Sequence, residues 1–261
     1  MTTEVQSVDV IIPVFNGRNT IEACINSVLA QKGKVIQKII VIDDGSSDDS
    51  ALIAINFNNP LIKVIKTTNQ GVANARNLGI KYSTAKWIAF LDVDDLWLPD
   101  KLFKQLHLAK HFDVKFVCCA VSTQLHLKSS LISARTLARG NFIATSSVLV
   151  RRDLLQQISP VFNSKMSFAE DYLVWLKCLT ISPGYYLSEK HAEYILSDQP
   201  RYRLNQILNN LLVVNIEYTK FLINIKLPLV TKLLLELSVA FGTLVAVISI
   251  FKRFISLRKY E

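Results

Sequence analysis

Apolar residues gather in four short runs over the first hundred positions of the chain. Each run is bounded by turn-forming residues, a pattern typical of buried strands. Residues 20–31 carry apolar side chains at helical spacing, and residues 72–82 are a second predicted helix. Because alternating strands and helices require crossover connections, the pattern predicts an α/β fold with a mostly parallel central sheet flanked by helices. The predicted strands are residues 8–15, 39–42, 62–65 and 87–91.

Polar residues stand at the end of every predicted strand. Phe15 and Asn16 end the first strand, D-D-G-S at 43–46 follows the second, N-Q-G at 69–71 the third and D-V-D-D at 92–95 the fourth. In a parallel sheet the carboxyl ends of the strands share one edge, and ligands bind in the crevice outside that edge. These clusters therefore predict one binding site.

The D-V-D-D motif at 92–95 places three carboxylates within four residues. Unpaired buried charge is strongly unfavourable, so the cluster predicts a bound cation, and hard oxygen ligands suit Mg²⁺ or Mn²⁺. An ion held by one or two carboxylates generally carries the phosphates of a substrate. A solvated acidic turn is the alternative that this motif leaves open when taken alone.

Five motifs in sequence order resemble the family 2 glycosyltransferases with the GT-A fold, of the bacterial surface-polysaccharide type. They are V-I-I-P-V-F-N, D-D-G-S, N-Q-G-V-A-N-A-R-N-L-G, F-L-D-V-D-D-L-W-L-P-D-K-L and A-E-D-Y. The resemblance covers residues 8 to about 180. It implies a GT-A domain over 1–200, with a nucleotide-binding half at 1–97 and an acceptor half at 98–200. A helical segment that associates with membranes is expected over 201–261.

The same resemblance implies roles for residues at the predicted sheet edge. Asp94 is expected to be the main metal ligand, and Asp92 to contact the ribose or the metal. Phe15 is expected to stack on the base and Asp44 to accept a hydrogen bond from it, while Arg76 reaches the acidic cluster or a phosphate. The expected nucleotide-binding residues are Pro13, Phe15, Asp44, Arg76 and Asp92.

Glu170 and Asp171 open a predicted helix over 172–179. Carboxylates are common at helix N-termini because they complement the helix dipole, so a structural role is an alternative. The resemblance implies that Asp171 is the general base, with Glu170 as the second candidate for that role. An inverting transfer needs one such base to deprotonate the acceptor hydroxyl. No Q-x-x-R-W motif follows, which favours the transfer of a single sugar over polymerisation.

Two further segments resemble parts of the family's site. Residues 140–150 are similar to the strand beneath the acceptor, where Ser146 and Ser147 either bind sugar or serve the fold. Residues 198–203 occupy the place of a mobile basic segment, which makes Arg201 and Arg203 candidate phosphate contacts, although the usual histidine is missing.

Charge is unevenly distributed along the chain. The net charge is +9, and residues 101–261 hold 21 Lys and Arg against 10 Asp and Glu, which favours an anionic partner. Nucleic acid is not expected, because the basic residues are scattered and form no known nucleic-acid module. Residues 237–251 carry no charge, but a membrane span needs about 20 residues. We therefore predict attachment of 227–261 to a membrane surface, with a true span or a soluble helix as alternatives.

These features together predict an inverting transferase of surface polysaccharide assembly (O-antigen, capsule or exopolysaccharide). The donor is expected to be a UDP-linked sugar and the acceptor a lipid-linked saccharide. Because residues 1–7 are polar and include no apolar targeting segment, we expect the protein at the cytoplasmic face of the inner membrane, peripheral or shallowly inserted. A nucleotidyltransferase acting on sugar phosphates and a non-catalytic nucleotide-sugar binding module are the alternative functions.

Overall fold

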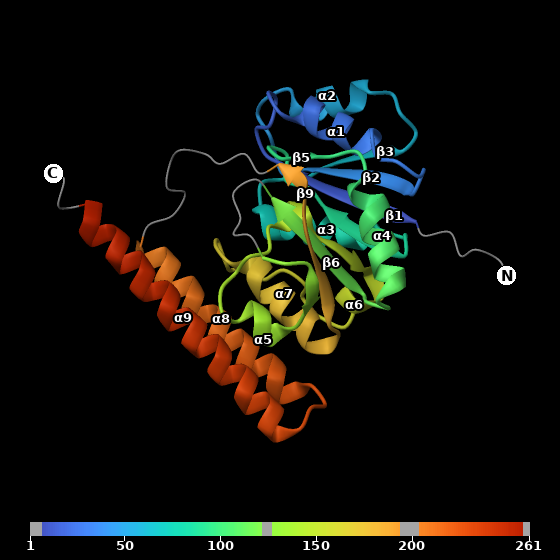
Figure 1. Ribbon diagram of the computed structural model, residues 1–261. Coiled ribbons are helices and arrows are strands. Elements are labelled where there is room, and N and C mark those ends of the chain that lie inside the picture. Colours follow the sequence, from blue (N-terminus) through green and yellow to red (C-terminus); the bar gives the residue numbers. More distant parts are fainter. Residues whose placement is uncertain (1–6, 122–126, 194–203, 258–261) are drawn as a thin grey trace.

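A mixed nine-stranded sheet forms the centre of the protein (Figure 1) in a computed structural model that describes residues 7–121, 127–193 and 204–257. The strand order is β3-β2-β1-β4-β8-β6-β9-β5, and β7 pairs with β9. The first four strands are parallel, whereas β8 runs antiparallel to both β4 and β6. The strands are β1 (Val8–Val14), β2 (Ile36–Asp43), β3 (Ile62–Lys66), β4 (Trp87–Phe90), β5 (Leu96–Trp97), β6 (Phe116–Val121), β7 (Ser130–Ile132), β8 (Leu149–Arg151) and β9 (Gly184–Glu193).

Helices cover both faces of this sheet, which explains why its inner strands read as unbroken apolar runs. Along β1, Val10 and Ile12 pack into the core beside α1 and α4, whereas Ile11 packs into the core that contains α7. The helices are α1 (Ile21–Leu29), α2 (Ser50–Asn56), α3 (Val72–Tyr82), α4 (Lys101–His111), α5 (Ala134–Leu137), α6 (Arg152–Leu155), α7 (Glu170–Ile181), α8 (Leu204–Asn224) and α9 (Leu229–Leu257), with a 3₁₀ turn, η1 (Thr145–Ser147).

The predicted α/β class and the mostly parallel sheet are confirmed, and the four predicted strands correspond to β1, β2, β3 and β4. The prediction of a strand over 140–150 is wrong for most of that run. Only Leu149–Arg151 forms β8, and η1 precedes it. The hydroxyls of the turn explain the difference, because Ser147 donates to the Ala144 carbonyl at 2.7 Å and Ser146 donates to Asp95. Such local side-chain bonds compete with a strand ladder.

The C-terminal helices α8 and α9 form an antiparallel hairpin along one side of the domain (Figure 1). Val214, Tyr218 and Val239 belong to the same apolar core as α7, and the Tyr218 hydroxyl shares a hydrogen bond of 2.6 Å with Thr180. The expected division at residue 200 falls within 194–203, outside the described residues. In the described part of the chain, no helix has both the length and the hydropathy to cross a bilayer.

Candidate active site

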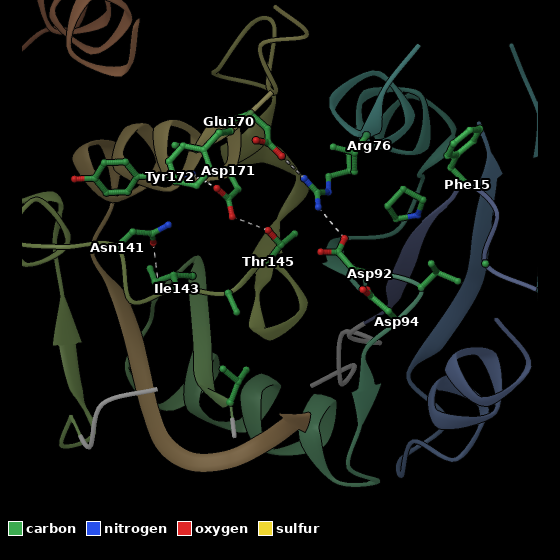
Figure 2. Close-up of a pocket in the computed structure, with 18 of the residues that line it drawn as sticks. Phe15, Arg76, Asp92, Asp94, Asn141, Ile143, Thr145, Glu170, Asp171 and Tyr172 are labelled. Atoms are coloured by element: carbon green, nitrogen blue, oxygen red, sulfur yellow. Dashed lines mark hydrogen bonds and ion pairs between the residues drawn. The ribbon is translucent and has the colours of Figure 1, made fainter. Parts of the chain in front are cut away.

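A cavity of about 1050 Å³ lies at the carboxyl ends of β1 and β4. Most of its lining comes from the segments that follow these two strands, the start of α3, the loop at 140–145, the start of α7, and the hairpin of α8 and α9. The predicted edge of the sheet is therefore one wall of a larger site. In Figure 2, Phe15 lies at one end, Asn141 and Tyr172 lie at the other, and the charged side chains lie between them.

The three carboxylates of the acidic loop have separate surroundings. Asp94 and the partly exposed Asp92 line the cavity. Asp95 is buried and accepts a hydrogen bond from the Ser146 hydroxyl, so it ties the loop to η1. In the described residues, no group of three or more acidic, cysteine or histidine side chains is placed to hold a metal by itself. Two cavity carboxylates match a Mg²⁺ or Mn²⁺ ion that completes its coordination with water and substrate phosphates.

Arg76, on α3, joins the acidic loop at 92–95 to the start of α7. The residue is 4% exposed, and its guanidinium donates to Asp92 Oδ1 at 2.7 Å and to Glu170 Oε1 at 2.8 Å (Figure 2). Burial alone would lower the pKa of Arg76, but Asp92 and Glu170 outweigh it and hold that pKa above its ordinary value. A permanently charged arginine therefore neutralises two carboxylates in a site with little solvent.

Replacement of Arg76 by Met is expected to lower the free energy of unfolding by roughly 3–5 kcal/mol, because Glu170 and Asp92 lose their buried countercharge. Urea denaturation followed by circular dichroism measures this change. Arg18→Met is the matched control, since Arg18 also pairs with a carboxylate, Asp49 at 3.2 Å, but both side chains are more than half exposed. That control should change stability by less than about 1 kcal/mol. Equal effects of the two substitutions would contradict the assignment of a stabilising role to Arg76.

Glu170 and Asp171 begin α7 directly after Ala169, which has a left-handed backbone with φ 59°. Burial raises the pKa of both carboxyls. Glu170 accepts from Arg76, whereas Asp171 accepts from the Thr145 hydroxyl at 2.9 Å and from the Tyr172 N–H at 2.7 Å. Asp171 has no direct ion pair among the described residues, so of the two carboxylates it is better suited to take up a proton.

Of the other residues predicted to bind the nucleotide, two line the cavity and one is buried outside its lining. Phe15 is 50% exposed and lines the cavity together with Pro13. Asp44 is buried outside the cavity lining, and its two oxygens accept the backbone N–H groups of Gln70 at 2.9 Å and Gly71 at 2.8 Å. Asp44 thereby orients the loop that leads into α3, and its contact with a base stays a prediction.

Arg201 and Arg203, the candidate phosphate contacts, lie outside the described residues. Ser146 and Ser147 were predicted from the sequence, whereas their neighbour Thr145, whose partner Asp171 is 26 residues away, was not. Its place in the same polar run was the one available signal. The contribution of α8 and α9 to the cavity was also missed, because an apolar helix gives no sign of which neighbour it packs against.

Comparisons with known proteins agree with this geometry. A family model, described as glycosyl transferase family 2, matches residues 9–127. The chain is 31% identical over 211 residues to WfgD of Escherichia coli, named UDP-Glc:alpha-D-GlcNAc-diphosphoundecaprenol beta-1,3-glucosyltransferase, and the match covers 76% of this chain and 78% of the relative. It is 33% identical to WfaP of Escherichia coli, which carries the same enzyme name, over 66% of this chain and 70% of that relative.

A third relative is longer than this chain. The match to an uncharacterized glycosyltransferase of Rickettsia prowazekii has 30% identity and covers 69% of this chain but 60% of the relative. Among solved structures, residues 1–349 of Staphylococcus aureus TarS superpose with a TM-score of 0.75 at 16% identity, over 90% of this chain and 71% of that one. At that identity the superposition shows the fold alone. The similarity to relatives that the chain covers over most of their length shows that it belongs to glycosyl transferase family 2.

Proposed function

We propose that this chain transfers one sugar, with inversion, from a UDP-linked donor to a lipid-linked saccharide acceptor in surface polysaccharide assembly. The observation that carries the proposal is a single cavity with Asp92 and Asp94 on one side and Asp171 on the other (Figure 2). The names of WfgD and WfaP support the donor and acceptor classes, because both specify UDP-Glc and a diphosphoundecaprenol-linked sugar. TarS has also been solved with UDP and with UDP-GlcNAc.

The donor would lie along the carboxyl edge of the sheet. Phe15 offers an exposed ring on which the base can stack. Arg76 holds Asp92 at 2.7 Å, which keeps this carboxylate directed into the cavity beside Asp94. Asp94 and Asp92 would hold a Mg²⁺ or Mn²⁺ ion, which supplies positive charge to stabilise the departing nucleoside diphosphate.

Asp171 would act as the base on the opposite side of the cavity. It would take the proton from the acceptor hydroxyl while that oxygen attacks the anomeric carbon from the side opposite the leaving phosphate. Its raised pKa makes the carboxylate more basic than an exposed aspartate, and the bonds from Thr145 and Tyr172 fix its direction. Glu170 keeps its negative charge partnered by Arg76 and does not compete for the proton.

Replacement of Thr145 by Val is expected to shift the acid limb of the pH–rate profile to higher pH. The Thr145 hydroxyl favours the charged form of Asp171 and lowers its pKa, so its removal raises that pKa further above the ordinary value. Transfer requires ionised Asp171 and therefore falls as the pH drops through this pKa. Transfer rates measured from pH 4 to 9 would show the shift, and Thr145→Ser should restore the normal limb. An unchanged limb in Thr145→Val would contradict the role of Thr145.

Nucleotide-sugar screening tests the proposed function as a whole. Purified protein would be incubated with individual nucleotide sugars, Mg²⁺ or Mn²⁺, and a diphosphate-linked saccharide acceptor. Formation of an extended acceptor together with a nucleoside diphosphate is the expected result. Release of pyrophosphate would instead identify a nucleotidyltransferase. Donor binding without turnover across the whole panel would identify a binding module.

We also propose that the helical hairpin attaches the protein to the cytoplasmic face of the inner membrane. Its acidic side chains are engaged within the hairpin: Glu217 pairs with Lys220 at 2.8 Å, and Glu236 accepts from Thr219 at 2.9 Å. The outer face is apolar, and exposed Lys226 lies at the turn between the helices. Such a face suits an anionic bilayer surface. Its large apolar side chains that are at least 45% exposed are Leu212, Ile216, Ile223, Leu229, Val230, Leu233, Leu234, Leu237, Phe241, Leu244 and Val245.

Replacement of both Leu237 and Phe241 by Ser is expected to abolish co-flotation with anionic vesicles, because the two side chains are each 66% exposed on α9. The matched control is the double substitution of Leu52 and Ile55 by Ser, since these side chains on α2 are 53% and 49% exposed. The control should float like the wild type. A wild-type protein that stays in solution with these vesicles would refute attachment.

A further inference from the structure

The α8–α9 hairpin forms one wall of the catalytic cavity. Leu211 of α8 lines the cavity with Gly242 and Thr243 of α9. The close approach of Gly242 to Ala138 places this wall beside Gly140 and Asn141 of the same lining. Figure 2 places Asn141 and Tyr172 on the far side of Asp171 from Phe15. Since the base of the donor is assigned to the Phe15 end, the hairpin wall faces the part of the cavity that is left for the acceptor.

Close backbone packing fixes this wall against the end of α5. A Cβ on Gly242 would lie 1.8 Å from the carbonyl oxygen of Ala138, so α9 can approach this closely only with glycine at that position. Asn215 of α8 donates to the Thr243 hydroxyl at 2.9 Å and links the two helices at the same level. Residues 138–140 therefore run from the contact with α9 to Gly140, which lines the cavity.

Two exposed arginines lie at this junction. Arg139 stands between Ala138 and Gly140, and Arg135 lies four residues earlier on α5. Neither guanidinium has a hydrogen bond or an ion pair within the described residues. Phe241, the neighbour of Gly242 in α9, is 66% exposed and belongs to the apolar outer face of the hairpin. Cationic groups that have no partner among the described residues therefore lie between the cavity and an apolar surface.

We propose that Arg139, assisted by Arg135, binds the diphosphate group of a lipid-linked acceptor. This inference rests on the proposed function and adds to it a site for the acceptor phosphates. In such an acceptor the diphosphate lies between the sugar and the lipid. In the protein, the arginines lie between the cavity, which suits the sugar, and the apolar hairpin face, which suits the lipid. Guanidinium groups bind phosphate oxygens through paired, charge-assisted hydrogen bonds.

The donor diphosphate is a poor occupant for this site. It is assigned to the carboxyl edge of the sheet beside Asp92 and Asp94, and Figure 2 shows these residues on the Phe15 side of Asp171, away from Asn141 and Tyr172. The arginines of the described lining are Arg18, three residues after Phe15 at the donor end, and Arg76. Arg76 is committed to Asp92 and Glu170 through its two terminal nitrogens, so neither arginine is placed to meet an acceptor phosphate. Arg135 and Arg139 supply the missing positive charge.

The test compares two acceptors that carry the same sugar, one on a short-chain lipid diphosphate and one on an uncharged alkyl glycoside. In detergent micelles, the double variant R135Q/R139Q should lower the ratio of kcat/KM for the charged acceptor to that for the uncharged one by about tenfold or more. Added salt should reduce the difference between variant and wild type. Lys81→Gln, on the exposed end of α3, is the control and should keep the wild-type ratio.

The alternative source of the same chemistry is a phospholipid headgroup. Binding to vesicles with and without anionic phospholipid, measured in the absence of acceptor, separates headgroup binding from binding of the acceptor diphosphate. Loss of vesicle binding by R135Q/R139Q with an unchanged acceptor ratio in micelles would overturn the proposal and assign the arginines to headgroups. An unchanged ratio together with unchanged vesicle binding would overturn it as well. If the wild type transferred sugar to neither acceptor, the result would contradict the proposed function itself, and the arginine site that rests on it would fall with it.

Discussion

Replacement of Asp171 by Asn is expected to reduce sugar transfer by roughly 10²–10⁴-fold while leaving donor binding intact. The amide keeps the shape of the side chain and can still accept from the Thr145 hydroxyl, which lies 2.9 Å from the native carboxylate. It cannot take up the proton of the acceptor hydroxyl. Initial rates with saturating donor measure the loss, and calorimetric titration with the nucleotide sugar checks that the donor site is preserved.

Glu170→Gln provides the contrast for this variant. Glu170 accepts from Arg76 at 2.8 Å, so its substitution removes a buried ion pair and is expected to act mainly on stability. Near-normal transfer by Asp171→Asn, with a large loss in Glu170→Gln, would move the role of base to Glu170. The anomeric configuration of the product tests inversion separately, because retention would rule out a single displacement.

Replacement of Asp94 by Ala is expected to lower transfer by at least roughly 10³-fold, because the leaving diphosphate would keep its full charge. Asp94 lines the cavity beside Asp92, whose Oδ1 is already engaged by Arg76. The same loss is expected for the wild type in excess EDTA, with recovery on addition of Mn²⁺ or Mg²⁺. Rates across a titration of the metal provide the measurement.

Asp49→Ala is the matched control for Asp94→Ala. Asp49 is an exposed carboxylate that pairs with Arg18, and it does not line the cavity. Its removal should change the rate by less than about twofold, since exposed ion pairs contribute little. Full wild-type activity in EDTA would contradict the proposed role of a divalent ion in stabilising the leaving group.

Local sequence patterns were sufficient for the first half of the fold. The runs at 8–15, 39–42, 62–65 and 87–91 became β1 to β4. The inner strands β1, β2 and β4 were readable because strands covered on both faces are rich in apolar residues. Parallel pairing then placed Phe15 and the acidic loop on one edge of the sheet, as predicted. The helix that begins with Glu170 was also predicted, and its two leading carboxylates suit a helix N-terminus, which is a local property.

Tertiary structure alone decided which of these polar residues meet. Arg76 contacts Glu170 across 94 positions of the chain, and Asp171 contacts Thr145 across 26. Ser146 became part of the scaffold because its hydroxyl donates to Asp95, the buried carboxylate of the acidic loop. The hairpin of α8 and α9 became a cavity wall because Gly242 lets it approach Ala138. Periodicity reports which face of an element is buried, but the partner against which it is buried depends on how the whole chain packs.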